Sequence, residues 1–262
     1  MFFLYFVTFP SHKRQTQNSN MKQLLFMLLS ILTTTIACSQ EGDTKVFNDP
    51  NAESRNVTGY KGVKVSHGIS LIIKQGNEEG VAVSASEKRF RDNIRTVVEN
   101  GVLNIYYDTE NFWKNEKKNK NLKAYVSVKT LEKLTGSSGS TIVVDGSLKT
   151  TKLMIGLSSG SSLKGEVQAT ELDIDQNSGA TSRLNGKAES VTVETSSGSG
   201  FYGYNLVTDV CHARASSGAH IEITVNREMD VKASSGGGIR YKGNGVIKSV
   251  STSSGGSVSK NG

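Results

Sequence analysis

Two carboxylates, Asp173 and Asp175, stand two residues apart in the second half of the chain. Paired acids on one surface could act as general acid and base on a glycosidic bond, as in enzymes that cleave polysaccharides. Both residues flank Ile174, so the alternation of a β-strand would turn both toward solvent. Glu194 and Arg214 add scattered charge instead of a converging cluster. We therefore predict no catalytic residues, and an enzyme that acts on carbohydrates stays the less favoured alternative.

A metal site is the second chemistry that the residue types suggest. Cys211 and His212 are followed by His220, and zinc binds both thiolates and imidazoles. In a strand, however, Cys211 and His212 would point to opposite faces, which leaves two histidines without a third ligand. We predict no metal and no cofactor, and we expect Cys211 to be a small core residue.

Aromatic and basic residues suit contact with sugars, because aromatic rings offer large amphipathic faces and lysines attract anionic polymers. The candidates for ligand contact are Trp113, Lys114, Lys117, Lys118, Tyr202 and Tyr204. Trp113 is the only Trp of the chain and lies with the lysines in an irregular insertion, residues 109–121. Two plainer interpretations stay open: a solvated basic loop, and a tryptophan that caps the end of a stack.

The composition limits the fold and the partners. The chain has 262 residues, of which 35% are apolar, and it contains 27 Gly but only 2 Pro. This apolar share is too low for a thick core, but it permits a thin core built by repetition. The net charge is +7, yet no nucleic-acid-binding motif accompanies it, so we expect no nucleic-acid partner.

A short Ser-Ser-Gly pattern recurs along the second half of the chain. Its glycines follow one another at spacings of 21, 19, 19, 20, 18 and 19 residues, which is typical of a stacked solenoid. They are Gly139, Gly160, Gly179, Gly198, Gly218, Gly236 and Gly255. Apolar residues alternate at a period of two on both sides of each glycine, which predicts strands. We therefore predict an all-β solenoid of about seven coils, each with a strand, a tight corner, a second strand and a variable turn.

The second serine of each pattern forms a column of its own: Ser138, Ser159, Ser178, Ser197, Ser217, Ser235 and Ser254. Stacked hydroxyls can donate to one neighbour and accept from the next, so we expect a hydrogen-bonded ladder along the corners. The glycines would supply backbone angles that other residues avoid. Such a ladder is structural in the first place, and it would also present a polar strip to a glycan.

The first half of the protein is also predicted to form strands. Residues 57–130 alternate in several short runs, and Glu99-Asn100-Gly101 is typical of a hairpin turn. Arg89 to Ile94 could form a short helical turn. No break in composition separates this half from the repeat, so we expect one continuous β structure.

The N-terminus has the features of an export signal. Met21 and a basic residue precede an apolar run and Cys38, which predicts a lipoprotein signal peptide at 21–37 and lipid attachment at Cys38. Residues 1–20 then belong to an upstream start that is not used, unless Met1 is the true start. Ordinary cleavage near a chance cysteine is the alternative to lipidation. The polar segment 38–56 is expected to be a flexible tether.

Three stretches resemble one family of bacterial exported proteins, the auto-transporter adhesin head GIN domain. They are GVKVSHGISLIIKQGNEEGVAVSASEK, NGVLNIYYD with AYVSVKTLEKLTGSSGS, and IRYKGNGVIKSVSTSSGGSVSKNG. The resemblance covers about residues 57–262, although the family often has Gly-Ser-Gly where this chain has Ser-Ser-Gly. It implies a right-handed β-helix-like fold, commonly behind a lipoprotein leader, and it implies no activity.

These observations favour an exported, lipid-anchored solenoid that binds a polysaccharide or an envelope protein without catalysis. A purely structural envelope protein is the first alternative, and a β-helix carbohydrate-active enzyme is the second. The expected location is the outer membrane or the cell surface, with the periplasm or the medium as alternatives. The ligand and the oligomeric state stay open.

Overall fold

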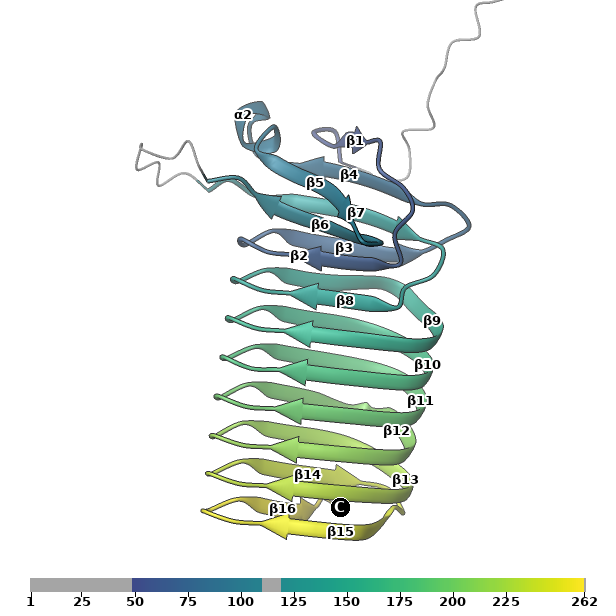
Figure 1. Ribbon diagram of the computed structural model, residues 1–262, viewed down its shortest axis with the longest axis vertical. Coiled ribbons are helices and arrows are strands. Elements are labelled where there is room, and N and C mark those ends of the chain that lie inside the picture. The colour runs from purple at the N-terminus through teal and green to yellow at the C-terminus, as the bar shows by residue number, and fades with distance from the viewer. Residues whose placement is uncertain (1–48, 110–118, 262) are drawn as a thin grey trace, which may run out of the picture. The chain divides into compact units, whose positions relative to one another are not determined.

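The computed structural model describes residues 49–109 and 119–261, drawn in Figure 1. Strands make up 65% of the chain and helix 2%, and the strands form a β-solenoid of about 7 turns. The prediction of an all-β solenoid is therefore confirmed. No helix in the described part is long and apolar enough to cross a membrane.

Five long strands build the regular coils. They are β9 (Thr141–Leu157), β10 (Ser162–Gln176), β11 (Thr181–Thr195), β12 (Gly200–Ala215) and β13 (His220–Ala233). Each pairs in parallel with the next; between β10 and β11, for example, the register runs from Ser162 opposite Thr181 to Gln176 opposite Thr195. Each long strand bends partway, so it contributes first to one parallel ladder and then to a second (Figure 1). Three shorter strands, β14 (Gly238–Lys242), β15 (Val246–Thr252) and β16 (Ser257–Lys260), continue the two ladders.

The core lies between the two ladders and consists of side chains in register from coil to coil. Ile174 and Val193, five residues before their corner glycines, are at most 2% exposed, and so is Cys211 of the neighbouring column. Burying one such aliphatic side chain stabilises the fold by roughly 1.5–3 kcal/mol. Val250 in β15 occupies the same column but is 58% exposed, since no described strand packs beyond it.

The first half of the chain adds coils whose order in the stack differs from their order in sequence. The strands concerned are β2 (Gly62–Val65), β3 (Ser70–Gln75), β6 (Val102–Tyr107), β7 (Lys123–Val128) and β8 (Lys133–Gly136). β2 pairs with both β6 and β8, and β3 pairs with both β7 and β9. The coil formed by β2 and β3 therefore lies between the β6–β7 coil and the β8–β9 coil. The sequence predicted a continuous β structure here but not this interleaving.

Antiparallel strands cover the end of the stack at the β6–β7 coil. They are β1 (Glu53–Arg55) on β4, β4 (Gly80–Ser84) on β7, and β5 (Ile94–Glu99) on β6. The predicted hairpin at Asn100-Gly101 joins β5 to β6, with φ of 50° and 73°. The predicted helical turn is α2 (Lys88–Arg91), slightly earlier than expected, and it buries Phe90.

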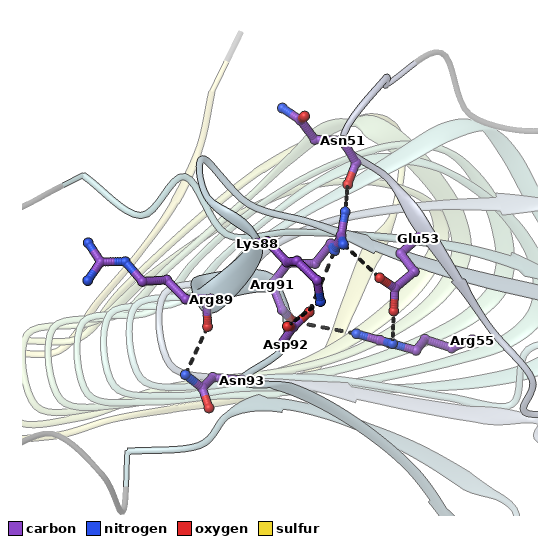
Figure 2. Close-up of polar contacts among 8 residues, drawn as sticks. All are labelled: Asn51, Glu53, Arg55, Lys88, Arg89, Arg91, Asp92 and Asn93. Carbon is purple, nitrogen blue, oxygen red and sulfur yellow. Dashed lines mark hydrogen bonds and ion pairs between the residues drawn. The ribbon is translucent and has the colours of Figure 1, made fainter.

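A polar cluster ties β1 to α2 at this end, as Figure 2 shows. The Arg91 guanidinium lies 2.8 Å from Glu53 and donates to the carbonyl of Asn51 at 3.0 Å. Arg55 also pairs with Glu53, and it donates to the Arg91 carbonyl at 3.4 Å. Because these contacts hold two elements of the cap together, we interpret the cluster as structural. They also show that the predicted tether, 38–56, includes an ordered strand, β1.

Candidate ligand-binding surfaces

The seven tight corners of the solenoid, which we call the corner column, are six Ser-Ser-Gly patterns and Asn177-Ser178-Gly179. Their second serines have φ between 47° and 52°, and their glycines between 69° and 76°. At the fourth corner the Ser199 N–H donates to the Ser196 carbonyl at 3.1 Å. Positive φ at both central residues together with this hydrogen bond defines a type I′ turn. Glycine adopts these angles without strain, and serine does so at a modest cost.

Successive corners are joined through the main chain. The N–H of Gly160 donates to the Ser178 carbonyl of the next coil at 3.0 Å, and Gly179 donates to Ser197 at 3.0 Å. The same bond recurs from Gly139 to Gly236 at 2.9–3.1 Å. The predicted hydroxyl ladder is therefore wrong in its chemistry: in the described residues, the second serines connect through their carbonyls, and their side chains lie exposed.

The hydroxyls that do bond along the stack belong to the residue after the glycine. Ser161 and Ser199 are at most 1% exposed. Ser161 donates from its hydroxyl to the Gly136 carbonyl, and Ser199 to the Gln176 carbonyl, both at 2.9 Å. Each bond reaches the previous coil, because the donor lies inside the corner. The hydrogen bonds of this column were not predicted from the sequence.

An eighth corner precedes the seven, at Ser66-His67-Gly68-Ile69. His67 and Gly68 have φ of 59° and 70°, and the Gly68 N–H donates to the Ser138 carbonyl at 3.0 Å. The pattern was missed because Gly68 lies far outside the 19-residue period, although Ser-His-Gly between two alternating runs carries the turn signal. Segment 108–122 joins β6 to β7, and its residues 110–118, with Trp113, Lys114, Lys117 and Lys118, lie outside the described residues.

Two predicted ligand residues are described, and both lie on the outer face of the first ladder. Tyr202 and Tyr204 stand two residues apart on β12, so they point to the same side, and both are half-buried. The guanidinium of Arg183 on β11 lies 4.6 Å from the ring centre of Tyr202. His220 on β13 meets the same ring edge-on, with centroids 4.8 Å apart. The ammonium of Lys242 on β14 lies 4.7 Å from the ring centre of Tyr204.

We call these five residues, Arg183, Tyr202, Tyr204, His220 and Lys242, the tyrosine cluster. Since β11 and β13 flank β12, the Tyr202 ring is held between two neighbours and offers no free face for a sugar ring. The cluster instead presents cations fixed by aromatic rings. Among the described residues, neither Arg183 nor Lys242 has a carboxylate within ion-pair distance. The cluster is therefore better suited to an anionic ligand than to sugar stacking.

The outer face of the second ladder carries the acid pair singled out in the sequence. Asp173 lies 3.6 Å from the Lys152 ammonium, which also bonds Glu171 at 3.0 Å. Asp175 stands beside Glu194 of the next strand in register. Asp175 and Glu194 line a shallow groove of about 280 Å³ together with Arg214 and Lys232. The groove therefore contains as many basic as acidic side chains.

The histidine and cysteine candidates are separated, as the strand alternation predicted. Cys211 is buried, which raises the pKa of its thiol to about 12, and it is free of any disulfide. His212 points outward and its Nδ1 lies 3.2 Å from Asp230. Within 49–109 and 119–261, no three His, Cys, Asp or Glu side chains converge in a way that could hold a metal ion.

A family model described as "Putative auto-transporter adhesin, head GIN domain" matches residues 59–245. Solved structures share the fold. A putative adhesin from Bacteroides fragilis is 15% identical, with a TM-score of 0.73 over 80% of this chain and 96% of that one. A putative lipid binding protein from Parabacteroides distasonis is 16% identical, with a TM-score of 0.63 over 82% of this chain and 98% of that one. A putative adhesin from Parabacteroides merdae is 14% identical, with a TM-score of 0.60 over 80% of this chain and 95% of that one. No curated protein matches the chain.

Proposed function

Because the chain belongs to the auto-transporter adhesin head GIN domain family, we propose that it is an exported, lipid-anchored adhesion module that binds an acidic polysaccharide without cleaving it. The observation that carries the proposal is the tyrosine cluster. Its cations lie on an open strand face and have no carboxylate partner among the described residues. A uronate, sulfate or phosphate group of a polymer would supply the missing anion.

The cluster is arranged for a repeating ligand. Its cations come from β11 and β14, and neighbouring strands of a stack lie about 4.8 Å apart. A polymer that lies across several coils would therefore meet charged side chains in succession. Each contact is weak and sensitive to salt, and the sum of several gives useful affinity. Arg183 loses little freedom on binding because the Tyr202 ring already fixes its guanidinium.

The attachment of the N-terminal segment supports a display role. Asp49 accepts a hydrogen bond from Tyr125 of β7 at 2.7 Å and lies 3.7 Å from Lys123. Burial acts to raise the pKa of Asp49, but hydrogen bonds from Tyr125, the Asn51 N–H and Ser84, together with the Lys123 charge, outweigh it and lower that pKa. The chain therefore enters the solenoid at its capped end.

A non-catalytic role accords with the acids of the second ladder. Asp173 lies beside Lys152, and Asp175 and Glu194 share their groove with Arg214 and Lys232. A glycosidase needs one carboxyl group kept protonated as an acid and one kept ionised. The side chains of Asp173 and Glu194 are 44% and 54% exposed, so both acids lie on open surface and not in an enclosed cleft. We therefore assign these residues to the solvated face of the strands.

The test of the proposal is retention of the full-length protein on immobilised alginate and heparin, with dextran as a neutral polymer. We expect retention on the acidic polymers that falls as salt increases. The double variant Arg183→Ala/Lys242→Ala should weaken it by about tenfold. The control Arg214→Ala/Lys232→Ala removes the same charge from the second ladder and should change it little. Equal losses in both variants would mean that net charge, and not the tyrosine cluster, governs binding.

The lipid anchor has a separate test. Cells that express the protein are labelled with radioactive palmitate, and Cys38→Ala is compared with the wild type. Label that disappears in the variant supports the anchor, and protease treatment of intact cells then reports surface display. Equal label in both would mean that Cys38 is not the site of attachment.

A further inference from the structure

A second surface lies where the long strands turn from the first ladder to the second. We call these segments the bend column; they are residues 144–151, 165–170, 184–189, 203–209 and 224–227. A groove of about 490 Å³ runs along them and takes residues from five successive strands, β9 to β13. It shares no residue with the tyrosine cluster or with the groove at Asp175.

The floor of the groove is made of small side chains. Ala188 is 6% exposed and Thr208 is 1% exposed, while Thr150 and Ala169 are half-buried. The Thr208 hydroxyl donates to the carbonyl of Val210 at 2.9 Å, and the Thr150 hydroxyl to that of Lys152 at 3.2 Å. Because these two threonine hydroxyls bond to the main chain, the apolar part of the lining comes from carbon atoms of its alanines and threonines and from Val207.

The walls of the groove are polar and carry no net charge. The charges of Lys149 and Lys187 are balanced by those of Glu189 and Asp209, so the lining has no net formal charge. Gln168, Thr170 and Asn226 add neutral donors and acceptors. None of the four charged side chains forms an ion pair with another described residue. A highly charged polymer would gain nothing here, whereas a neutral ligand rich in hydroxyl groups would find donors and acceptors on both sides.

The direction of the groove excludes recognition of a peptide by strand addition. That mode needs a free strand edge that runs parallel to the ligand. Here the groove crosses the strands, and the main chain on either side pairs with the next coil, for example Ala169 with Ala188 and Glu171 with Ser190. The ladder skips only the residues at the turn itself, such as Thr170 opposite Glu189. A ligand in the groove must therefore be bound mainly through side chains.

From the open groove, its apolar floor and its balanced walls we propose that the bend column binds a linear, neutral glycan laid parallel to the axis of the stack. The carbon-bound hydrogens of the sugar rings would lie on Ala169, Ala188 and the threonine methyl groups. Their hydroxyls would exchange hydrogen bonds with the amides, ammonium groups and carboxylates of the walls. This site is independent of the acidic ligand that we assign to the tyrosine cluster.

The experiment is calorimetric titration of the full-length protein with cellohexaose, laminarihexaose, mannohexaose and maltohexaose. We expect at least one of the four to bind. Ala169→Phe fills the floor and should weaken that binding at least tenfold, and Asp209→Ala should weaken it severalfold. The matched controls are Thr141→Phe and Asp175→Ala, which place the same changes on the outer faces of the first and second ladders and should leave binding unchanged. Thermal melting of each variant verifies that it is folded.

The inference would be overturned if no hexaose binds, or if Ala169→Phe binds as well as the wild type while it remains folded. The variant Arg183→Ala/Lys242→Ala separates the two proposals. If it abolishes retention on alginate and leaves the hexaose bound, both sites stand. If it abolishes hexaose binding as well, the neutral glycan lies on the tyrosine cluster and the groove is not its site.

Discussion

The two edges of the solenoid, the corner column and the bend column, differ in how regular their turns are. In the corner column, every turn from 137–140 to 253–256 has nearly the same two positive φ values, and every turn but the last donates the same hydrogen bond to the next coil. In the bend column, the register shifts between β9 and β10, between β11 and β12, and between β12 and β13. The corners are thus nearly identical, and the bends vary in length.

This difference explains why the repeat is so visible in the sequence. A stacked corner must match the corner on each side of it, so a deviation in one turn breaks bonds to two neighbours. A bend is free of this requirement, because bulges absorb an extra residue. The variable bends leave a groove, while the uniform corners leave a regular polar strip. Structural constraint and candidate binding surface therefore fall on opposite edges of the same core.

The largest expected effect tests a strict requirement for glycine in the bends. A Cβ on Gly186, at φ of 112°, would lie 2.1 Å from the Val167 carbonyl oxygen, so we expect Gly186→Ala to cost about 3 kcal/mol or more. Gly198→Ala in a corner meets open space and should cost only about 1–2 kcal/mol, the penalty of the left-handed backbone. Urea denaturation measures both, and equal losses would contradict the contrast.

The next prediction concerns the core that the two edges share. Burial raises the pKa of the Cys211 thiol from 9.0 to about 12, so above pH 9 the unfolded chain releases a proton that the folded chain retains. This contribution to stability is complete below pH 9 and is lost as the pH rises. We expect wild type to lose about 2 kcal/mol more than Cys211→Ala between pH 8 and 10.5. Urea denaturation at both pH values measures the difference, and parallel losses would show that the thiol is accessible.

A smaller effect separates the two serine columns of the corners. Ser199→Ala removes a buried hydroxyl that donates to Gln176 and accepts from the Ser196 N–H at 3.1 Å. We expect a loss of about 1 kcal/mol, because the Gln176 carbonyl keeps its main-chain bond from Ser196. Ser197→Ala, on the exposed column, should change the free energy of unfolding by less than about 0.5 kcal/mol. A larger loss of unfolding free energy in Ser197→Ala would indicate that the exposed serine hydroxyls do form a stabilising ladder.

The smallest effect is expected on the outer face of the second ladder. Lys152 bonds Glu171 and lies near Asp173, but all three side chains are well exposed. Surface ion pairs of this kind contribute about 0–1 kcal/mol. Lys152→Ala should therefore lower the melting temperature by no more than a few degrees. A loss as large as that of Gly186→Ala would mean that this charge ladder helps to set the stacking.

The sequence was sufficient for the regular coils, because their period and strand alternation are local signals. The columns of Ile174 and Cys211 were assigned to the core from this alternation alone, and both are buried. The interleaving of the β2–β3 coil could not be predicted, since it depends on pairings across about 70 residues. A register of this kind leaves no periodic trace in one sequence.

The candidate surfaces were predicted less well than the fold. Tyr202 and Tyr204 were identified by type, but their partners, Arg183 and Lys242, come from other strands. Which cation lies over which ring depends on the register between coils. The groove of the bend column was missed entirely, because its floor consists of alanine and threonine, which carry no chemical signal in a sequence.

The central claim is that the solenoid binds an acidic polysaccharide and leaves it intact. The most direct measurement incubates the full-length protein with alginate of defined length and follows the mixture by size-exclusion chromatography with light scattering. We predict that the protein co-elutes with the polymer and that the mass of the polymer stays constant over time. Shortened polymer would identify an enzyme, and a protein that elutes alone at low salt would contradict binding.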